Sequence, residues 1–180
     1  MGKHFSSIRV FVASTVCFLA TASWVNAGPP RIVSKYTSTA RANALEYKEF
    51  SGEGTDGFRT LFAGLGGYNL EHLAGDERSW INVRHGNHTV DLYAATMEAG
   101  GGTFPRKAND VVEWRGVETR GVFTPCAIIY RIEAGNDETR KTHTRLVVIK
   151  LDREKSAIIG FAKGNDEKAA QAIADRACSH

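Results

Sequence analysis

The chain has 180 residues, of which 23 are Lys or Arg and 20 are Asp or Glu, so its formal net charge is +3 at pH 7. Nucleic-acid binding depends on clustered Lys and Arg side chains that neutralise phosphates. Such a nearly balanced charge argues against nucleic acid as a partner.

Residues 1–27 have the composition of a secretory signal peptide. Lys3 and Arg9 give a basic start, an apolar run follows, and Val-Asn-Ala at 25–27 offers compact residues suited to a cleavage site. A retained membrane anchor is the alternative, but the uncharged run is shorter than the roughly 20 residues that a span needs. We expect cleavage after Ala27, export to the periplasm or the medium, and no membrane span in the mature protein.

Removing this leader changes both the charge and the cysteine count. The leader holds two of the 23 basic residues and no acidic one, which leaves 21 basic against 20 acidic residues. Cys126 and Cys178 remain of the three cysteines, and an even pair in an oxidising compartment favours one structural disulfide. Residues 28–180 show no repeat or linker and predict a single secreted domain.

The first two thirds of the mature chain predict short strands separated by turns. Residues 28–44 are polar without clear periodicity and predict a loose lead-in, and the glycine-rich segment 98–110 predicts a mobile loop. Alternating or apolar runs predict strands at 45–50, 58–62, 68–73, 80–84, 90–96 and 111–115.

The segment from Cys126 to Cys178 gives the clearest pattern, three antiparallel strands followed by a helix. The strands are expected at 126–134, 145–151 and 156–163. The second of these is apolar on both faces, which predicts a central strand covered on both sides. Asn165 is the expected N-cap of the helix. The helix has one mostly alanine face and places Lys168, Gln171 and Asp175 on the opposite face.

This topology predicts a disulfide between Cys126 and Cys178. The last strand climbs about 25 Å and the helix descends about 18 Å, so the two cysteines arrive at similar heights. Closing a loop of this length stabilises the fold by about 4 kcal/mol in the chain-entropy model. Two buried free thiols are the alternative.

The predicted fold class is α+β. About eight short strands form an antiparallel sheet that is strongly curved or divided into two layers, with the C-terminal helix packed on it. Because the one predicted helix comes last, it cannot provide the crossovers that parallel strands require.

Three features invite chemical hypotheses. The Gly64-Leu65-Gly66-Gly67 run lacks the spacing of a phosphate-binding loop and predicts a bend or bulge. His85 and His88, with Asp91 nearby and His72 elsewhere, could hold a metal. A glycine-containing turn fixes no such geometry, however, and we expect neither a metal nor a cofactor. Glu113, Glu118 and Glu133 are candidates for acid–base catalysis, but we expect them on solvated strand faces rather than in a catalytic pair. No catalytic residue is assigned.

One local basic cluster is formed by Arg140, Lys141 and Arg145, with His143 among them. It is a candidate anion-binding surface for an envelope polymer or a lipid headgroup. A solvated hairpin tip is the alternative.

Three segments together resemble a family of small, secreted, uncharacterised proteobacterial proteins. They are Leu65-Gly66-Gly67-Tyr68, Asp110-Val111-Val112-Glu113-Trp114-Arg115 and Leu146-Val147-Val148. The family commonly has Cys-Pro-Gly where this chain has Phe62-Ala63-Gly64, so that cysteine and any second disulfide are absent here. The resemblance implies export and a similar fold, and it implies no activity.

The sequence therefore predicts an exported, non-enzymatic envelope protein, a binding or accessory module. A secreted inhibitor of a cell-wall hydrolase is the alternative, by analogy of fold alone. A small hydrolase that uses Glu113 or a histidine is a third candidate. The partner is not specified by the sequence.

Overall fold

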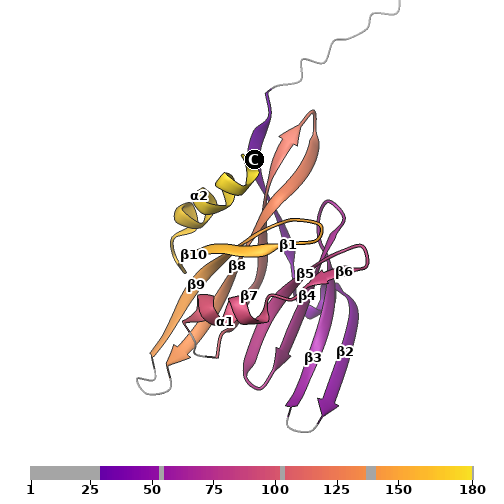
Figure 1. Ribbon diagram of the computed structural model, residues 1–180, viewed down its shortest axis with the longest axis vertical. Helices are drawn as coiled ribbons and strands as arrows, with labels where there is room; N and C mark the ends of the chain where they lie inside the picture. The colour runs from indigo at the N-terminus through magenta and orange to yellow at the C-terminus, as the bar shows by residue number, and fades with distance from the viewer. Residues whose placement is uncertain (1–28, 53–54, 102–103, 137–140, 180) are drawn as a thin grey trace, which may run out of the picture.

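The computed structural model describes residues 29–52, 55–101, 104–136 and 141–179, so the expected leader at 1–27 lies outside the described residues. These residues form two five-stranded antiparallel sheets and two α-helices (Figure 1). The α+β class, the antiparallel pairing and the C-terminal helix are confirmed. The expected count of about eight strands is wrong, since the described residues form ten. Of the two expected arrangements, the division into two sheets is the one observed. No helix in the described part of the chain is long and apolar enough to cross a membrane.

The first sheet has the strand order β1-β7-β8-β9-β10. Its strands are β1 (Arg31–Ser38), β7 (Arg106–Thr119), β8 (Val122–Asn136), β9 (Lys141–Lys150) and β10 (Ala157–Lys163). The three strands expected in the C-terminal third are therefore present as β8, β9 and β10, in the expected antiparallel order.

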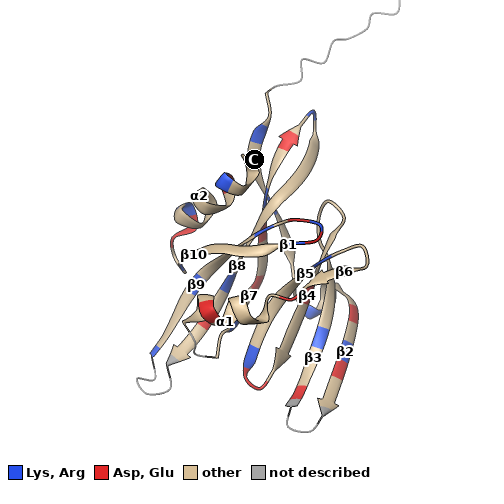
Figure 2. Ribbon diagram, in the orientation of Figure 1, with Lys and Arg blue, Asp and Glu red and all other residues tan. Residues whose placement is uncertain are grey.

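The second sheet keeps its strands in chain order. They are β2 (Ala44–Gly52), β3 (Thr55–Ala63), β4 (Tyr68–Gly75), β5 (Arg78–His85) and β6 (His88–Val90). A short 3-10 helix, η1 (Arg41–Asn43), joins β1 of the first sheet to β2, and α1 (Tyr93–Gly100) leads from β6 back to β7. Basic and acidic residues are interspersed along β2 and β3 (Figure 2).

The layers are the second sheet, the first sheet and α2 (Glu167–Cys178), with the first sheet in the middle (Figure 1). The core between the sheets includes Phe62, Leu70, Ile81, Trp114, Ile128, Tyr130, Val147 and Ile149. A second core, on the opposite face of the first sheet, joins Ala127, Ile129, Leu146 and Val148 to Ala170 and Ala174 of α2. Strand β9 contributes to both cores, which confirms that it is central and covered twice.

The polar segment at 28–44 is not a loose lead-in. Residues Arg31–Ser38 form β1, which pairs along its whole length with β7. Side-chain contacts also hold this edge strand. Trp114 donates from its indole nitrogen to the Thr37 hydroxyl at 2.8 Å, and at the surface Arg31 forms an ion pair with Glu118 at 2.7 Å.

Residues 90–96 are not a strand, because β6 ends at Val90 and the chain then forms α1. The Asn82 side chain accepts a hydrogen bond from the Leu92 amide at 2.9 Å and fixes the start of this turn. Alanine, methionine and glutamate in α1 favour a helix, and Gly101 ends it with φ 81°. The expected loop at 98–110 is correspondingly shorter, since its first residues belong to α1 and its last to β7.

The N-cap of α2 is Asp166, one residue later than expected, because its carboxylate accepts from the Ala169 amide at 3.0 Å. Asp166→Ala is expected to lower the free energy of unfolding by about 1 kcal/mol, measured by urea denaturation. Asn165→Ala is the matched control and should change it by less than about 0.5 kcal/mol. A larger loss in the control than in the Asp166 variant would contradict this assignment.

Candidate functional site

A groove of about 440 Å³ lies where α2 meets the outer face of the first sheet. The described residues that line it belong to β1, β7, β8, β9 and α2. They are Tyr36, Asn109, Val111, Glu113, Ile129, Tyr130, Arg131, Leu146, Glu167 and Gln171. Strand β7 places Glu113 in this lining, between the core residues Val112 and Trp114, which point to the opposite face.

The Glu113 side chain is buried, with the residue only 8% exposed. One of its oxygens, Oε1, accepts from the Ser34 hydroxyl at 2.5 Å and from the Gln171 amide at 2.8 Å. The Arg115 guanidinium lies 4.0 Å from the same oxygen. The expectation that Glu113 occupies a solvated face is wrong, because α2 covers the outer face of β7 at this position.

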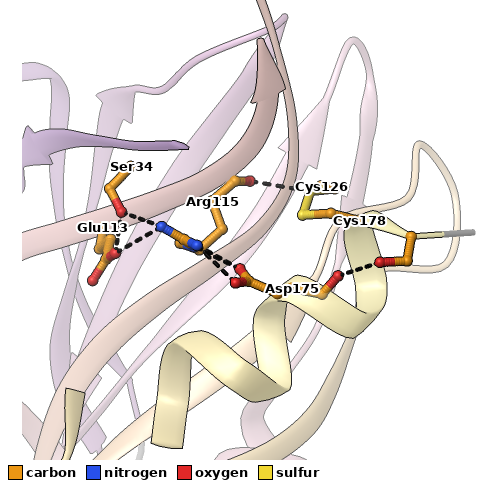
Figure 3. Close-up of a disulfide and its surroundings, with 7 residues drawn as sticks. Ser34, Glu113, Arg115, Cys126, Asp175 and Cys178 are labelled. Carbon is orange, nitrogen blue, oxygen red and sulfur yellow. Dashed lines mark hydrogen bonds and ion pairs between the residues drawn. A yellow bond between two sulfur atoms is a disulfide. The ribbon is translucent and has the colours of Figure 1, made fainter. Parts of the chain in front are cut away.

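Arg115 joins the Glu113 carboxylate to α2 (Figure 3). Its guanidinium donates two bonds to the Asp175 carboxylate, both at 2.8 Å, and one to the Ser34 hydroxyl at 2.6 Å. Paired, bidentate contacts of this kind fix geometry as well as charge. The single positive charge of Arg115 faces the two carboxylates of Glu113 and Asp175, so these three side chains have a net charge of −1.

The spacing of these residues explains why they meet. Gln171 and Asp175 are four residues apart on a helix, a rise of about 6 Å. Glu113 and Arg115 are two residues apart on a strand, a rise of about 6.6 Å. Because the two distances agree, Gln171 meets Glu113 while Asp175 meets Arg115. The expectation that Gln171 and Asp175 lie opposite the packed face of the helix is therefore wrong, and this matched spacing is the signal that could have found the site.

The disulfide lies at the C-terminal end of α2, close to Asp175 (Figure 3). Cys126 and Cys178 are joined, with their Cα atoms 5.2 Å apart, which lies within the usual range for a disulfide. The Cys126 sulfur lies 3.3 Å from the backbone oxygen of Arg115. The cross-link therefore holds the C-terminal turn of α2 beside the residue that binds Asp175.

Two exposed side chains and one ion pair form the walls of the groove. Tyr36 is the cross-strand neighbour of Glu113 and is 61% exposed, and Val111 is 52% exposed. On the other side Arg131 donates to Glu167 at 2.8 Å. The Nε of Arg131 is buried and has no hydrogen-bond partner among the described residues. The groove thus offers an aromatic ring, an apolar side chain and an unused donor around a buried carboxylate.

The residues of the candidate anion-binding surface lie elsewhere, at the start of β9. Arg140 lies outside the described residues, and Lys141 is exposed at the first position of the strand. Arg145 donates to the backbone oxygen of Ala99 at 2.5 Å, at the C-terminal end of α1, where a helix attracts positive charge. Its guanidinium also lies 4.6 Å from the centre of the Phe161 ring. Anion binding at this surface remains a prediction.

The glycine run and the histidine turn both form tight connections. Gly66 and Gly67 have φ values of 63° and 85° in the turn between β3 and β4, where a strand and not a helix follows. The expected bend is confirmed. His85 and His88 pair across the β5–β6 turn, and the Nε2 of His88 is 2.9 Å from the backbone oxygen of Glu154. Within the described ranges, no three His, Cys, Asp or Glu side chains are grouped as metal ligands.

His72, which the sequence offered as a further metal ligand beside His85 and His88, belongs to no group of possible metal ligands among the described residues. It lies on β4, 9% exposed, beside a cavity of about 410 Å³, and its Nε2 has no partner in the part of the chain that the structure describes. Burial, followed by the charge of Lys107, lowers the pKa of His72 to about 4. The imidazole is therefore neutral at neutral pH, and it packs edge-on against Phe58 with ring centres 5.3 Å apart.

No family model, no curated protein and no solved structure matches this chain. The resemblance to a secreted proteobacterial family stays a prediction.

Proposed function

We propose that this chain is an exported, non-enzymatic binding module of the cell envelope, whose ligand places a protonated amine against Glu113 in the groove beside α2. The observation that carries the proposal is a buried carboxylate, held in place by three side chains, whose charge is only partly balanced. Export rests on the leader-like sequence of residues 1–27. The disulfide suits the same oxidising compartment.

The charge balance favours a cationic ligand. Arg115 binds Asp175 through two short bonds and stands 4.0 Å from Glu113, and Arg131 is matched by Glu167. The groove and its supporting network therefore keep one net negative charge, and that charge lies on a side chain with little access to water. An opposite charge placed close to such a buried carboxylate is strongly favoured.

The free side of the carboxylate is available to a ligand. All recorded contacts of Glu113 go to Oε1, and its Oε2 accepts no bond from any described residue. An ammonium group could donate to Oε2 while its alkyl stem packs against Val111 and the ring of Tyr36. Tyr36 adds a cation–π contribution when the charge lies over its face. A lysine side chain or a diamine has this shape and chemistry.

The surroundings of Glu113 support binding rather than catalysis. Its Oε1 is occupied by bonds from Ser34 and Gln171, and the described lining of the groove holds no histidine, cysteine or lysine. Glu167, the other carboxylate of the lining, is committed to Arg131. The remaining acid–base candidates, Glu118 and Glu133, form ion pairs with arginines at 2.7 and 2.8 Å.

We expect Nα-acetyl-lysine amide to bind the wild-type protein and Glu113→Gln to weaken its affinity by about tenfold or more, measured by isothermal titration calorimetry. The amide has the shape of the carboxylate and can still accept from Ser34 and Gln171, so the fold should be preserved. The loss of the charge is then what the measurement reports.

Glu167→Gln is the matched control, since it removes a carboxylate of the same groove whose charge Arg131 already balances. Its affinity should stay within about threefold of the wild type. The proposed function is overturned if the lysine derivative does not bind, or if both variants weaken it equally.

A further inference from the structure

The end of the first sheet at β9 and β10 carries a second groove, separate from the one beside α2. It has a volume of about 810 Å³ and lies where β10 ends and the chain turns toward α2. Its described lining includes His143, Thr144, Arg145, Phe161, Lys163 and Asn165, and no carboxylate. A groove of this size falls in the range of specific ligand sites.

A close backbone approach forms the base of this groove. The Gly164 amide donates to the Thr144 backbone oxygen at 2.9 Å. A Cβ atom on Gly164 would stand only 1.9 Å from the Thr144 hydroxyl oxygen, so only glycine fits. This contact ends the pairing of β10 with β9 and leaves the first residues of β9 exposed beside the groove.

The side chains at this groove combine fixed and exposed positive charge. Arg145 is held by the Ala99 backbone oxygen and by the Phe161 ring, and it pairs across the strands with Lys163, which is exposed. Lys141 and His143 lie on the same face of β9 as Arg145, because alternate residues of a strand share a face. The basic groups thus continue from the groove along the exposed start of β9.

The two carboxylates that follow in the chain do not cancel this charge. Asp166 accepts from the Ala169 amide as the cap of α2, and Glu167 pairs with Arg131. Counted over its described lining, the groove therefore has a net positive charge. Phe161, 49% exposed, adds an apolar surface within it.

We propose that this groove binds an anionic oligosaccharide, a segment of a polymer whose carboxylate, sulfate or phosphate groups repeat along the chain. Two observations favour a repeating polyanion over a single small anion. The basic side chains from Lys141 to Arg145 extend over about 13 Å of strand, farther than one small anion reaches. The groove also offers an aromatic surface for the flat face of a sugar ring, and hydroxyl and amide groups on Thr144 and Asn165 for its hydroxyls.

The test uses a fluorescein-labelled heparin hexasaccharide as the probe and fluorescence anisotropy as the readout. The wild-type protein is expected to bind it and to lose affinity steadily between about 50 and 200 mM salt, because bound ions are released on association. Lys141→Glu combined with Lys163→Glu is expected to weaken binding by about tenfold or more. Both lysines are exposed, so the melting temperature should not change.

Lys150→Glu combined with Lys155→Glu is the matched control. Both residues are exposed lysines at the other end of the β9–β10 pair, and the change in net charge is the same. This variant should stay within about threefold of wild-type affinity. An equal loss in the two double variants, no binding at low salt, or binding to phosphatidylglycerol vesicles without binding to the hexasaccharide overturns the proposal.

Discussion

Replacing Cys126 and Cys178 together by serine is expected to lower the free energy of unfolding by about 4 kcal/mol. The two cysteines are 52 residues apart in the sequence, and closing a loop of this length removes much of the conformational freedom of the unfolded chain. Chemical denaturation by urea under oxidising conditions measures the loss. The midpoint should fall and the slope should rise, because the unfolded chain is less compact without the cross-link.

Reduction of the wild-type protein is the control for this prediction, since it removes the cross-link without a substitution. The reduced wild type should match the double variant, and the variant itself should not respond to the reductant. Thiol titration of the unfolded, oxidised mature protein should find no reactive sulfhydryl. Two reactive sulfhydryls, or a double variant as stable as the wild type, would contradict the disulfide.

Arg115→Met should be the most damaging single substitution in the network beside α2, with an expected loss of about 3 kcal/mol in the free energy of unfolding. The change removes two bonds to Asp175 and one to Ser34. It also leaves the carboxylate of Glu113, whose side chain is only 10% exposed, without its nearby cation. Thermal or urea unfolding gives the loss.

Arg31→Met is the comparison, because Arg31 also binds a carboxylate of the first sheet, at 2.7 Å, but its side chain is 73% exposed. An exposed pair of this kind contributes less than about 1 kcal/mol. Adding Glu113→Gln to Arg115→Met should restore about 1 kcal/mol, since the uncompensated charge is then gone. Equal losses for the two arginine variants would mean that Arg115 does not hold a buried network.

The C-terminal third was predictable from sequence because each of its signals is local and strong. Strand β9 reads as apolar on both faces, and the structure covers it with the second sheet on one side and α2 on the other. The disulfide is predicted because the last strand and the C-terminal helix have similar lengths, which brings Cys178 back to the level of Cys126. Two details differ. The N-cap is Asp166 rather than Asn165, although both residue types suit the role, and Gln171 and Asp175 face β7 rather than solvent.

The parts that were missed depend on partners far away in the sequence. Strand β1 has no periodic pattern of its own and is a strand because it pairs with β7, more than seventy residues later. Helix α1 was expected as a strand because residues 90–96 contain apolar and aromatic side chains. The side chain of Asn82 on β5 turns the chain at Leu92, a contact that no local pattern shows.

The candidate site was missed for the same reason. Glu113 alternates with Val112 and Trp114, and alternation alone places it on the outer face of a sheet without saying whether that face is covered. Only the register of α2 against β7 brings Gln171 and Asp175 to Glu113 and Arg115. The basic residues at the start of β9 were visible as a cluster, whereas the groove beside them is made by Gly164 and Thr144.

Binding of an amine at Glu113 can be followed at the Glu113 carboxyl carbon by NMR, in protein labelled at the glutamate side chains. Nα-acetyl-lysine amide and Nα-acetyl-norleucine amide are titrated in parallel, because the two ligands share an alkyl stem and differ in the terminal ammonium. An ammonium bound at Glu113 should give a saturable shift of the Glu113 resonance with the lysine derivative and none with the norleucine derivative. Equal shifts with both ligands, or no shift with either, would show that Glu113 does not bind the ammonium group.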